Sequence, residues 1–366
     1  MAGNPSALTV GKRDLWFDNI KGILMVFVVI GHFSATLVSA NESVEIIYKI
    51  INSFHMPCFM IVTGYLSQRR VRQKDYSKMF TRLIIPYFTA QLLVYLSAAL
   101  IPNGLHFINV QSAEGINFFT PSYHLWFLCA VILFNLITPK LSELFAKCPY
   151  ALLLLSFALS AGVGYCAEVF ALRLTKSIAF YPFFLIGFFC KKEFILHLKS
   201  TKWIKAISAA VFLCACGLFI KYNDFIFYKI FPMATPYDKY SEEFSGAYPV
   251  AARCVLLAAA PIISFAFMSL VPKCKTIFTY VGQRSMYVYV LHGIFVIYLR
   301  TVSKYYFDIY GKIDKWYEIT AFLLLCVGLT FVLASTPVKK AFGWILEPKI
   351  NLPKRNADTT AAAAEK

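Results

Sequence analysis

Four of the six histidines lie within or at the ends of long apolar segments: His32, His55, His124 and His292. An imidazole inside a membrane-spanning segment is costly, and such ionisable residues usually face the interior of the helix bundle and take part in function. A neutral imidazole titrates near pH ~6.5, so it can accept and return a proton at physiological pH. These residues therefore indicate acid–base chemistry within a membrane. For His55 and His124, close to the predicted outer interface, a packing role is an equally good interpretation.

His32 stands out because of its spacing from Lys21. The two residues are 11 positions apart, which is three full turns at ~100° per residue, so both lie on one helix face. A rise of ~1.5 Å per residue separates them by ~16 Å, which predicts Lys21 at the membrane boundary and His32 near the bilayer midplane. Asp18 falls close to the same face. A cation at the entrance and an imidazole at depth suit a ligand with an anionic head and a long reactive tail.

His292 lies in the middle of another apolar segment, where Ser285 and Tyr289 precede it by seven and three positions and share its helix face. The sequence contains no H-E-x-x-H or other zinc-ligand spacing, no G-x-S-x-G elbow and no Walker loop. We therefore predict histidine acid–base chemistry without a metal. Acyl transfer to a hydroxyl fits these residues, because it needs a base, a stabiliser for the oxyanion and a firmly held acyl donor.

A group of basic residues lies between the second and third predicted helices: Arg69, Arg70, Arg72, Lys74, Lys78 and Arg82. We expect this group on the same side of the membrane as Lys21. Arginine side chains bind phosphate groups in a bidentate manner, so the group could hold a polyphosphorylated donor. The positive-inside rule explains its presence equally well.

The composition identifies the class of protein. Of the 366 residues, 59% are hydrophobic and only 15% are charged, which is typical of an integral membrane protein. The formal net charge of +17 does not indicate nucleic-acid binding, because the basic residues gather at the ends of apolar segments, where they orient the chain in the membrane. The ten cysteines form no C-x-x-C pair, and we interpret them as small buried hydrophobic residues.

Apolar segments predict ten helices, near residues 20–39, 46–66, 83–101, 124–139, 151–170, 178–190, 205–222, 251–271, 284–301 and 317–336. Basic residues recur in alternate loops, whereas 102–123 contains no Lys or Arg. The alternation predicts an all-α polytopic helix bundle with both termini in the cytoplasm. We expect a cytoplasmic segment at 1–15, a transmembrane domain at 16–340 and a cytoplasmic tail at 341–366, whose end is disordered.

Five segments, in this order, resemble the acyltransferase 3 family of membrane O-acyltransferases: DNIKGILMVFVVIGH, FHMPCFMIVTGYL, TRLIIPYF, YHLWFL and GQRSMYVYVLHG. The resemblance extends over about residues 14–337 and is strongest to the fucose 4-O-acetylase-like sugar acetyltransferases. It implies a polytopic enzyme that uses acetyl-CoA from the cytoplasm and acylates a cell-envelope glycan.

The resemblance also implies roles for particular residues. Lys21 and His32 match the family's basic residue and catalytic histidine, which are separated by ten residues. Many members have Arg at the first of these positions, and Lys keeps the charge but loses the bidentate fork. Arg69 and Arg72 match the family's Arg-x-x-Arg element, and Arg82 lies in the basic stretch that leads to the third helix.

We therefore expect a multi-pass O-acetyltransferase of the plasma or inner membrane that acts on a lipid-linked or polymeric glycan. The expected catalytic residues are His32, His292 and Ser285, the donor-binding residues are Lys21, Arg69, Arg72 and Arg82, and the acceptor-binding residues are Asp18, His55, His124 and Trp126. His32 either deprotonates the acceptor hydroxyl or carries the acyl group transiently, and the acyl group itself can be acetyl or a longer chain. The alternative is a transporter of a glycan or anion. The lack of visible inverted repeats and the scarcity of Asp and Glu within the spans argue against it.

Overall fold

The computed structural model describes residues 13–348 except 39, 74–75, 77–78, 102–115, 170, 224–229, 234, 240–247 and 308–312. Within these ranges every regular element is a helix. Nine helical segments of the described chain are long and apolar enough to cross a membrane, and a further apolar helix is shorter. The prediction of an all-helical polytopic membrane protein is therefore confirmed. Most of the predicted N-terminal segment and the end of the predicted C-terminal tail lie outside the described residues.

The ten predicted helices all appear in the structure: α1 (Leu15–Ser34), α2 (Glu42–Arg72), α4 (Ile85–Ala99), α5 (Trp126–Leu144), α6 (Pro149–Gly162), α7 (Leu174–Phe189), α9 (Lys202–Lys221), α10 (Tyr248–Leu270), α12 (Ser285–Val302) and α13 (Trp316–Leu333). A π-helical turn, η1 (Phe80–Ile84), leads into α4. Three short helices were not predicted: α8 (Lys192–Ser200), α11 (Ile277–Gln283) and α14 (Thr336–Leu346). The last of these continues across residue 340, where the sequence placed the end of the membrane domain.

Helix α2 is longer at both ends than its apolar core at 46–66. Its N-terminus is capped by Asn41, whose side chain accepts a hydrogen bond from the Val44 amide at 3.2 Å, and its last turn is rich in arginine. A side-chain cap at the start and cations at the end both stabilise the free backbone groups of a helix. The helix also continues through Pro57. The polar termini therefore extend α2 beyond the segment that hydrophobicity alone delimits.

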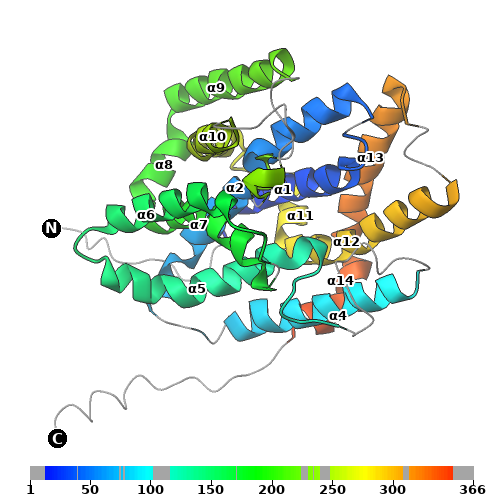
Figure 1. Ribbon diagram of the computed structural model, residues 1–366, viewed down its shortest axis with the longest axis horizontal. Coiled ribbons are helices and arrows are strands. Elements are labelled where there is room, and N and C mark those ends of the chain that lie inside the picture. Colours follow the sequence, from blue (N-terminus) through cyan, green and yellow to red (C-terminus); the bar gives the residue numbers. More distant parts are fainter. Residues whose placement is uncertain are drawn as a thin grey trace, which may run out of the picture.

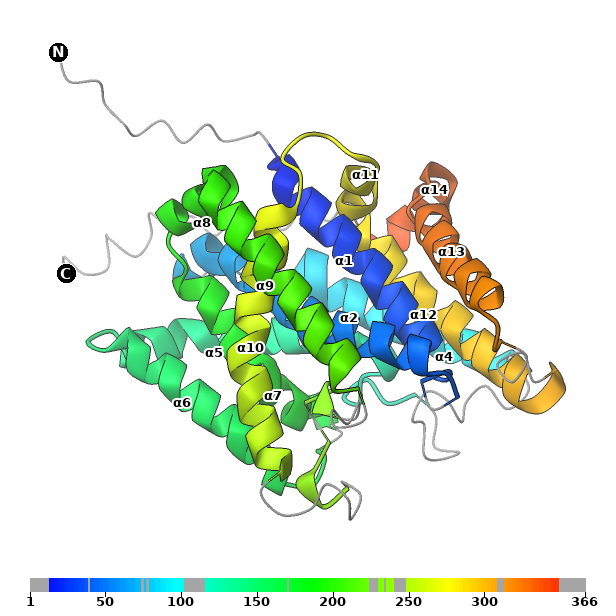
Figure 2. The same ribbon diagram turned by 90° about the horizontal axis from the view of Figure 1, so that it is seen from above.

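Helices α1 and α2 lie near the centre of the bundle, with α9 and α10 toward one edge and α4 and α14 toward the opposite edge (Figure 1). One face of the bundle holds the start of α1 and α12 and the end of α2 and α7 (Figure 2). There Arg13 donates a hydrogen bond to the Gln283 carbonyl at 3.4 Å, and Gln68 donates one to the Gly187 carbonyl at 3.0 Å.

We call this face the basic face, because it carries Arg13, Lys21, Arg69, Arg72, Arg82 and Arg284. The positive-inside rule predicts that it is cytoplasmic. On the opposite face α1 and α12 end and α2 begins. There the buried Lys49 ammonium donates hydrogen bonds to the Asn223 carbonyl and side chain, at 2.7 and 2.8 Å, and joins the start of α2 to the end of α9.

Glycines permit two very close helix crossings. Gly22 and Gly282 lie at the crossing of α1 with α11, and Gly64 and Gly187 lie at the crossing of α2 with α7. A Cβ atom on any of these four residues would overlap a backbone carbonyl of the facing helix. Helices packed through small residues in this way approach backbone to backbone, which favours association within a membrane. The two crossings hold α1 and α2, which carry His32 and His55, in a fixed position.

Asn19, a fully buried residue of α1, ties the connection between α10 and α11 to the bundle. Its amide nitrogen donates hydrogen bonds to the Pro272 and Cys274 carbonyls at 2.8 and 2.7 Å. Its amide oxygen accepts from the Thr276 and Thr279 hydroxyls at 2.8 and 2.5 Å. All polar atoms of this side chain are thus satisfied, as a buried amide requires, and α11 is fixed to the first turns of α1.

Candidate active site

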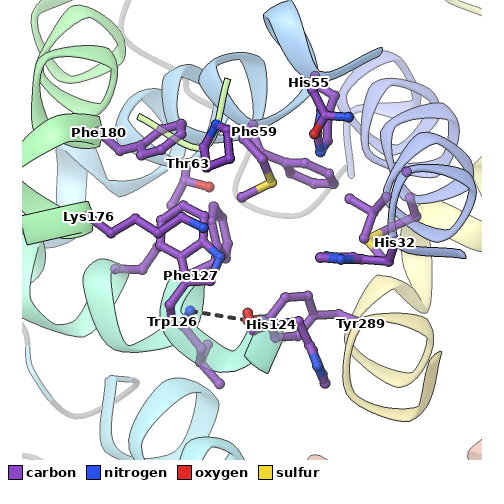
Figure 3. Close-up of a pocket in the computed structure, with 18 of the residues that line it drawn as sticks. His32, His55, Phe59, Thr63, His124, Trp126, Phe127, Lys176, Phe180 and Tyr289 are labelled. Atoms are coloured by element: carbon purple, nitrogen blue, oxygen red, sulfur yellow. Dashed lines mark hydrogen bonds between the residues drawn. The ribbon is translucent and has the colours of Figure 1, made fainter. Parts of the chain in front are cut away.

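A cavity of about 270 Å³ lies among α1, α2, α5, α7 and α12 (Figure 3). Much of its wall is aromatic or aliphatic and includes Met25, Phe59, Phe127 and Phe180. The polar and ionisable side chains that line it are His32, Tyr48, Asn52, His55, Thr63, His124, Trp126, Lys176, Ser285 and Tyr289. A largely apolar chamber with a few converging polar groups is the usual form of a small-molecule site.

The cavity lining connects the two faces of the bundle. Leu83 of η1 and Ser285, the first residue of α12, line it from the basic face. Phe231 and Pro232, which follow α9 on the opposite face, line it as well. A molecule in this cavity can therefore contact groups from both halves of the bundle.

Three histidine rings from three helical segments form a cluster at the side of the cavity. The ring centroids of His32 and His292 are 5.3 Å apart, those of His124 and His292 are 4.7 Å apart, and those of His32 and His124 are 6.5 Å apart. His32 and His124 line the cavity, whereas His292 is completely buried and lies behind them. The sequence predicted each of these residues for the site, and the structure brings their rings together.

His292 is oriented by its own helix. Its Nδ1 atom lies 2.9 Å from the Val288 carbonyl oxygen, one helical turn earlier, and a hydrogen bond to a carbonyl requires Nδ1 to carry the proton. Its Nε2 atom has no hydrogen-bond partner among the described residues. A buried nitrogen acceptor without a partner is costly, and a proton passed from the neighbouring His32 ring would satisfy it.

The position of His124 depends on α12. The Tyr289 hydroxyl donates a hydrogen bond to the His124 carbonyl at 2.6 Å, and the same oxygen lies 3.4 Å from the Leu128 amide nitrogen. The His124 ring rests on Gly293, where a Cβ atom would overlap it. Tyr289 thus anchors the start of α5, and Gly293 leaves the space that the His124 ring occupies.

His32 lies in the last turn of α1. Within α1, His32 is therefore nearer to the end at the opposite face than to the middle of the helix. This corrects the expectation of a midplane position. The cause is the start of α1 at Leu15, five residues before the predicted start. The carbonyl oxygen of His32 accepts a hydrogen bond from the Arg300 guanidinium at 3.1 Å. This bond joins the end of α1 to the end of α12 and holds the backbone that carries the imidazole.

The structure also places other predicted residues in the cavity. His55, Trp126 and Ser285 all contribute to its lining. The Nδ1 atom of His55 lies 2.8 Å from the Ile51 carbonyl oxygen, so its Nε2 atom is the group that can act on a ligand. The catalytic and acceptor-binding roles of these residues remain predictions.

Lys21 and Asp18 lie outside the cavity lining. The nearly inaccessible Asp18 carboxylate forms ion pairs with Lys21 and with Arg13, each at 2.8 Å, and the Gln283 amide lies 3.4 Å from it. In this conformation Asp18 is engaged by neighbouring cations. Asp18 does not line the cavity in which an acceptor would bind, so its predicted contact with the acceptor is not seen. The role of Lys21 in donor binding stays a prediction.

Arg69, Arg72 and Arg82 are exposed on the basic face and do not line the cavity. The guanidinium of Arg72 lies 5.7 Å from the centroid of the Phe188 ring. Exposed guanidinium groups are available to a phosphorylated ligand, and their assignment to the donor remains a prediction. Among the described residues no three His, Cys, Asp or Glu side chains are placed to hold a metal ion.

Lys176 is a cavity residue that the sequence analysis missed. Its ammonium lies 4.3 Å from the centroid of the Trp126 ring. The sequence does contain an indication, because Lys176 is the one lysine in the apolar segment 174–189. Only the packing of α5 against α7, however, brings its side chain to the cavity.

The chain is similar to known proteins in the following ways. The family model of the acyltransferase 3 group, described as "Acyltransferase domain", matches residues 14–335. The nodulation protein NolL of Sinorhizobium fredii is 28% identical over 232 residues, 58% of each chain, and that of Mesorhizobium japonicum is 39% identical over 70 residues, 18% of this chain and 19% of its own. The alignments thus span less than two thirds of either relative. No solved structure matches the chain.

The family match extends over most of the chain and includes all the helices that line the cavity. It therefore favours the enzyme over the alternative of a transporter. The chain is a multi-pass membrane protein that belongs to the acyltransferase 3 family.

Proposed function

We propose that the protein is an O-acetyltransferase that moves an acetyl group from acetyl-CoA to a sugar hydroxyl of a cell-envelope glycan, in the plasma or inner membrane. The observation that carries the proposal is the histidine cluster at the side of a cavity whose lining reaches the basic face. The cluster supplies the proton-handling groups for acyl transfer, and the lining supplies a route for the acyl donor.

The basic face fits the donor. Arg69, Arg72 and Arg82 present exposed guanidinium groups there, and together with Lys21 they would hold the phosphates of acetyl-CoA. Leu83 in η1, next to Arg82, already lines the cavity. The narrow pantetheine arm would enter at this end and carry the thioester toward His32.

His32 would then act as the base. It takes the proton from the acceptor hydroxyl while the hydroxyl oxygen attacks the thioester carbonyl carbon. The carbon–sulfur bond breaks, and the thiolate takes up the proton from the imidazole as coenzyme A leaves. Alternatively, the His32 imidazole attacks the carbonyl carbon first and passes the acetyl group to the hydroxyl in a second step. In both routes His292 lies where it can stabilise the charge that develops on His32, and Ser285 is available as a hydrogen-bond donor.

The opposite end of the cavity fits a sugar. Trp126, Tyr48 and Phe231 present aromatic rings there, and the polar side chains of Asn52 and His55 lie among them. Such a mixture binds a ring that has one apolar face and several hydroxyls. The acceptor would thus approach His32 from the side opposite to the donor.

Transfer of radiolabelled acetyl groups from acetyl-CoA to extracted envelope glycan, by the full chain purified in detergent, tests this function. The His32→Ala variant should lose at least ~100-fold in rate, because general base catalysis contributes about 10²- to 10⁴-fold, and it should keep a monodisperse elution profile. The matched control is His197→Ala in α8, whose side chain is exposed outside the cavity. Near-normal turnover of the His32 variant would contradict the proposal.

A further inference from the structure

The cavity contains a cation that the proposed reaction does not use. Lys176 extends into the cavity from α7, on the side opposite to His32 (Figure 3). Its ammonium lies over the Trp126 ring, 4.3 Å from the centroid. A cation–π contact stabilises an ammonium only in part, and a charge in an apolar chamber is costly without an opposite charge beside it.

No described residue forms a direct ion pair with this ammonium. Among the described residues that line the cavity none is Asp or Glu, and within the described chain Lys176 forms no salt bridge. Glu168 acts on Lys176 electrostatically, but its carboxylate is bonded to Arg173 at 2.6 Å. The other basic groups of the lining are the three histidines His32, His55 and His124. The chamber is thus built from potential cations and hydrogen-bond donors, which favours an anionic ligand.

The position of Lys176 along α7 identifies which substrate carries the anion. Helix α7 ends at Phe189 on the basic face. Lys176 precedes that end by 13 residues, or ~20 Å at ~1.5 Å per residue. It is therefore far from the exposed arginines that would bind the phosphates of acetyl-CoA, and it lies toward the acceptor end of the cavity.

We propose that Lys176 binds an anionic group of the acceptor, so that the preferred substrate is a negatively charged sugar. This inference rests on the proposed function and deepens it. The anion has two chemical sources: the phosphate that links a sugar to a carrier lipid, and the carboxylate of a uronic acid. Lys176 would hold either group across the cavity from His32 and so orient the hydroxyl toward the imidazole.

The test compares three soluble acceptors of matched size with the full purified chain and labelled acetyl-CoA: a methyl hexoside, the hexose 1-phosphate and the methyl hexuronoside. We expect kcat/KM to be about 10- to 100-fold higher for an anionic sugar, the usual value of a hydrogen bond to a charged group. Preference for the phosphate assigns the anion to the lipid linkage, and preference for the hexuronoside assigns it to the sugar. Equal use of all three sugars would overturn the role of Lys176 while leaving the acetyltransferase activity intact.

Variants give a second, independent readout. Lys176→Met keeps the length of the side chain but removes its charge, and it should raise the KM for the anionic sugar about 10- to 100-fold more than the KM for the neutral one. Lys176→Arg should restore most of the affinity and guards against a folding defect. Lys221→Met is the matched control, because it removes an exposed charge at the end of α9, on the face opposite to the basic face. An unchanged KM in Lys176→Met would also overturn the proposal.

Discussion

The imidazole ring of His124 fills the space above Gly293 that a side chain at this position would occupy. The two residues belong to different helical segments: His124 lies just before α5, and Gly293 follows His292 in α12. The contact sets how closely His124 approaches His292, whose ring centroid is 4.7 Å away. The geometry of the cluster is therefore decided by the absence of one methyl group.

Gly293→Ala should push the His124 ring away from His292. Overpacking of this kind costs about 1–3 kcal/mol, and a displacement of about 1 Å at a reacting centre lowers rates about 100-fold. We expect acetyl transfer to fall by at least ~10-fold, with a small drop in thermal stability. Gly217→Ala is the control, because no atom of a neighbouring residue lies within 4 Å of a Cβ there. Equal effects of both substitutions on the rate would contradict the role of Gly293.

His292→Gln should lower kcat by about 100-fold, the lower end of the contribution of an acid–base group. The amide keeps hydrogen-bonding capacity but cannot share a proton with His32. The initial rate at saturating acetyl-CoA and acceptor measures the effect, and His197→Gln in the exposed part of α8 serves as the comparison. A change confined to KM would instead make His292 a packing residue.

Asn19→Asp should destabilise the protein although it preserves the shape of the side chain. The new carboxylate oxygen would face the Pro272 and Cys274 carbonyls, which now accept hydrogen bonds from the amide. The loss of each buried partner costs about 1–3 kcal/mol, so we expect about 2–6 kcal/mol in total and a clearly lower melting temperature in detergent. Asn117→Asp is the control. Its side chain still accepts the hydrogen bond from the Phe119 amide, so the stability of the protein should stay unchanged.

Arg300→Met should reduce turnover by loosening the end of α1. The variant loses the hydrogen bond from the guanidinium to the His32 carbonyl, so the imidazole is held less firmly. We expect kcat to fall about 10-fold, because a positioning defect raises the barrier of the chemical step, while the KM for acetyl-CoA stays constant. Steady-state kinetics separate the two constants. Lys304→Met, an exposed charge beyond the same helix, should behave as the unmodified chain.

The membrane fold could be predicted from the sequence because each span is a long apolar segment. All ten segments became helices, and the errors lie at their ends. Hydrophobicity does not predict a polar helical extension such as the last turn of α2 at Arg72, nor a short helix such as α11 or the amphipathic α14. These elements depend on caps, on the helix dipole and on contacts such as those of Asn19.

The candidate site was predicted in part. An imidazole in an apolar segment stands out in the sequence, and the structure gathers His32, His124 and His292 into one cluster. Their mutual contacts depend on how α1, α5 and α12 cross, which a single sequence does not encode in any local pattern. The same holds for Lys176, whose partner Trp126 lies 50 residues away, and for the ion pair that engages Asp18.

Leu83 and Ser285 at the basic face and Phe231 and Pro232 at the other face line the same chamber. Under the proposed function, the donor and the acceptor would reach His32 from these two directions, and neither of them would cross the bilayer. The acyl group would then change compartment through the exchange of one covalent bond. A bundle of this kind can work in a single conformation, without the alternating inward-open and outward-open states that a carrier needs to move its cargo.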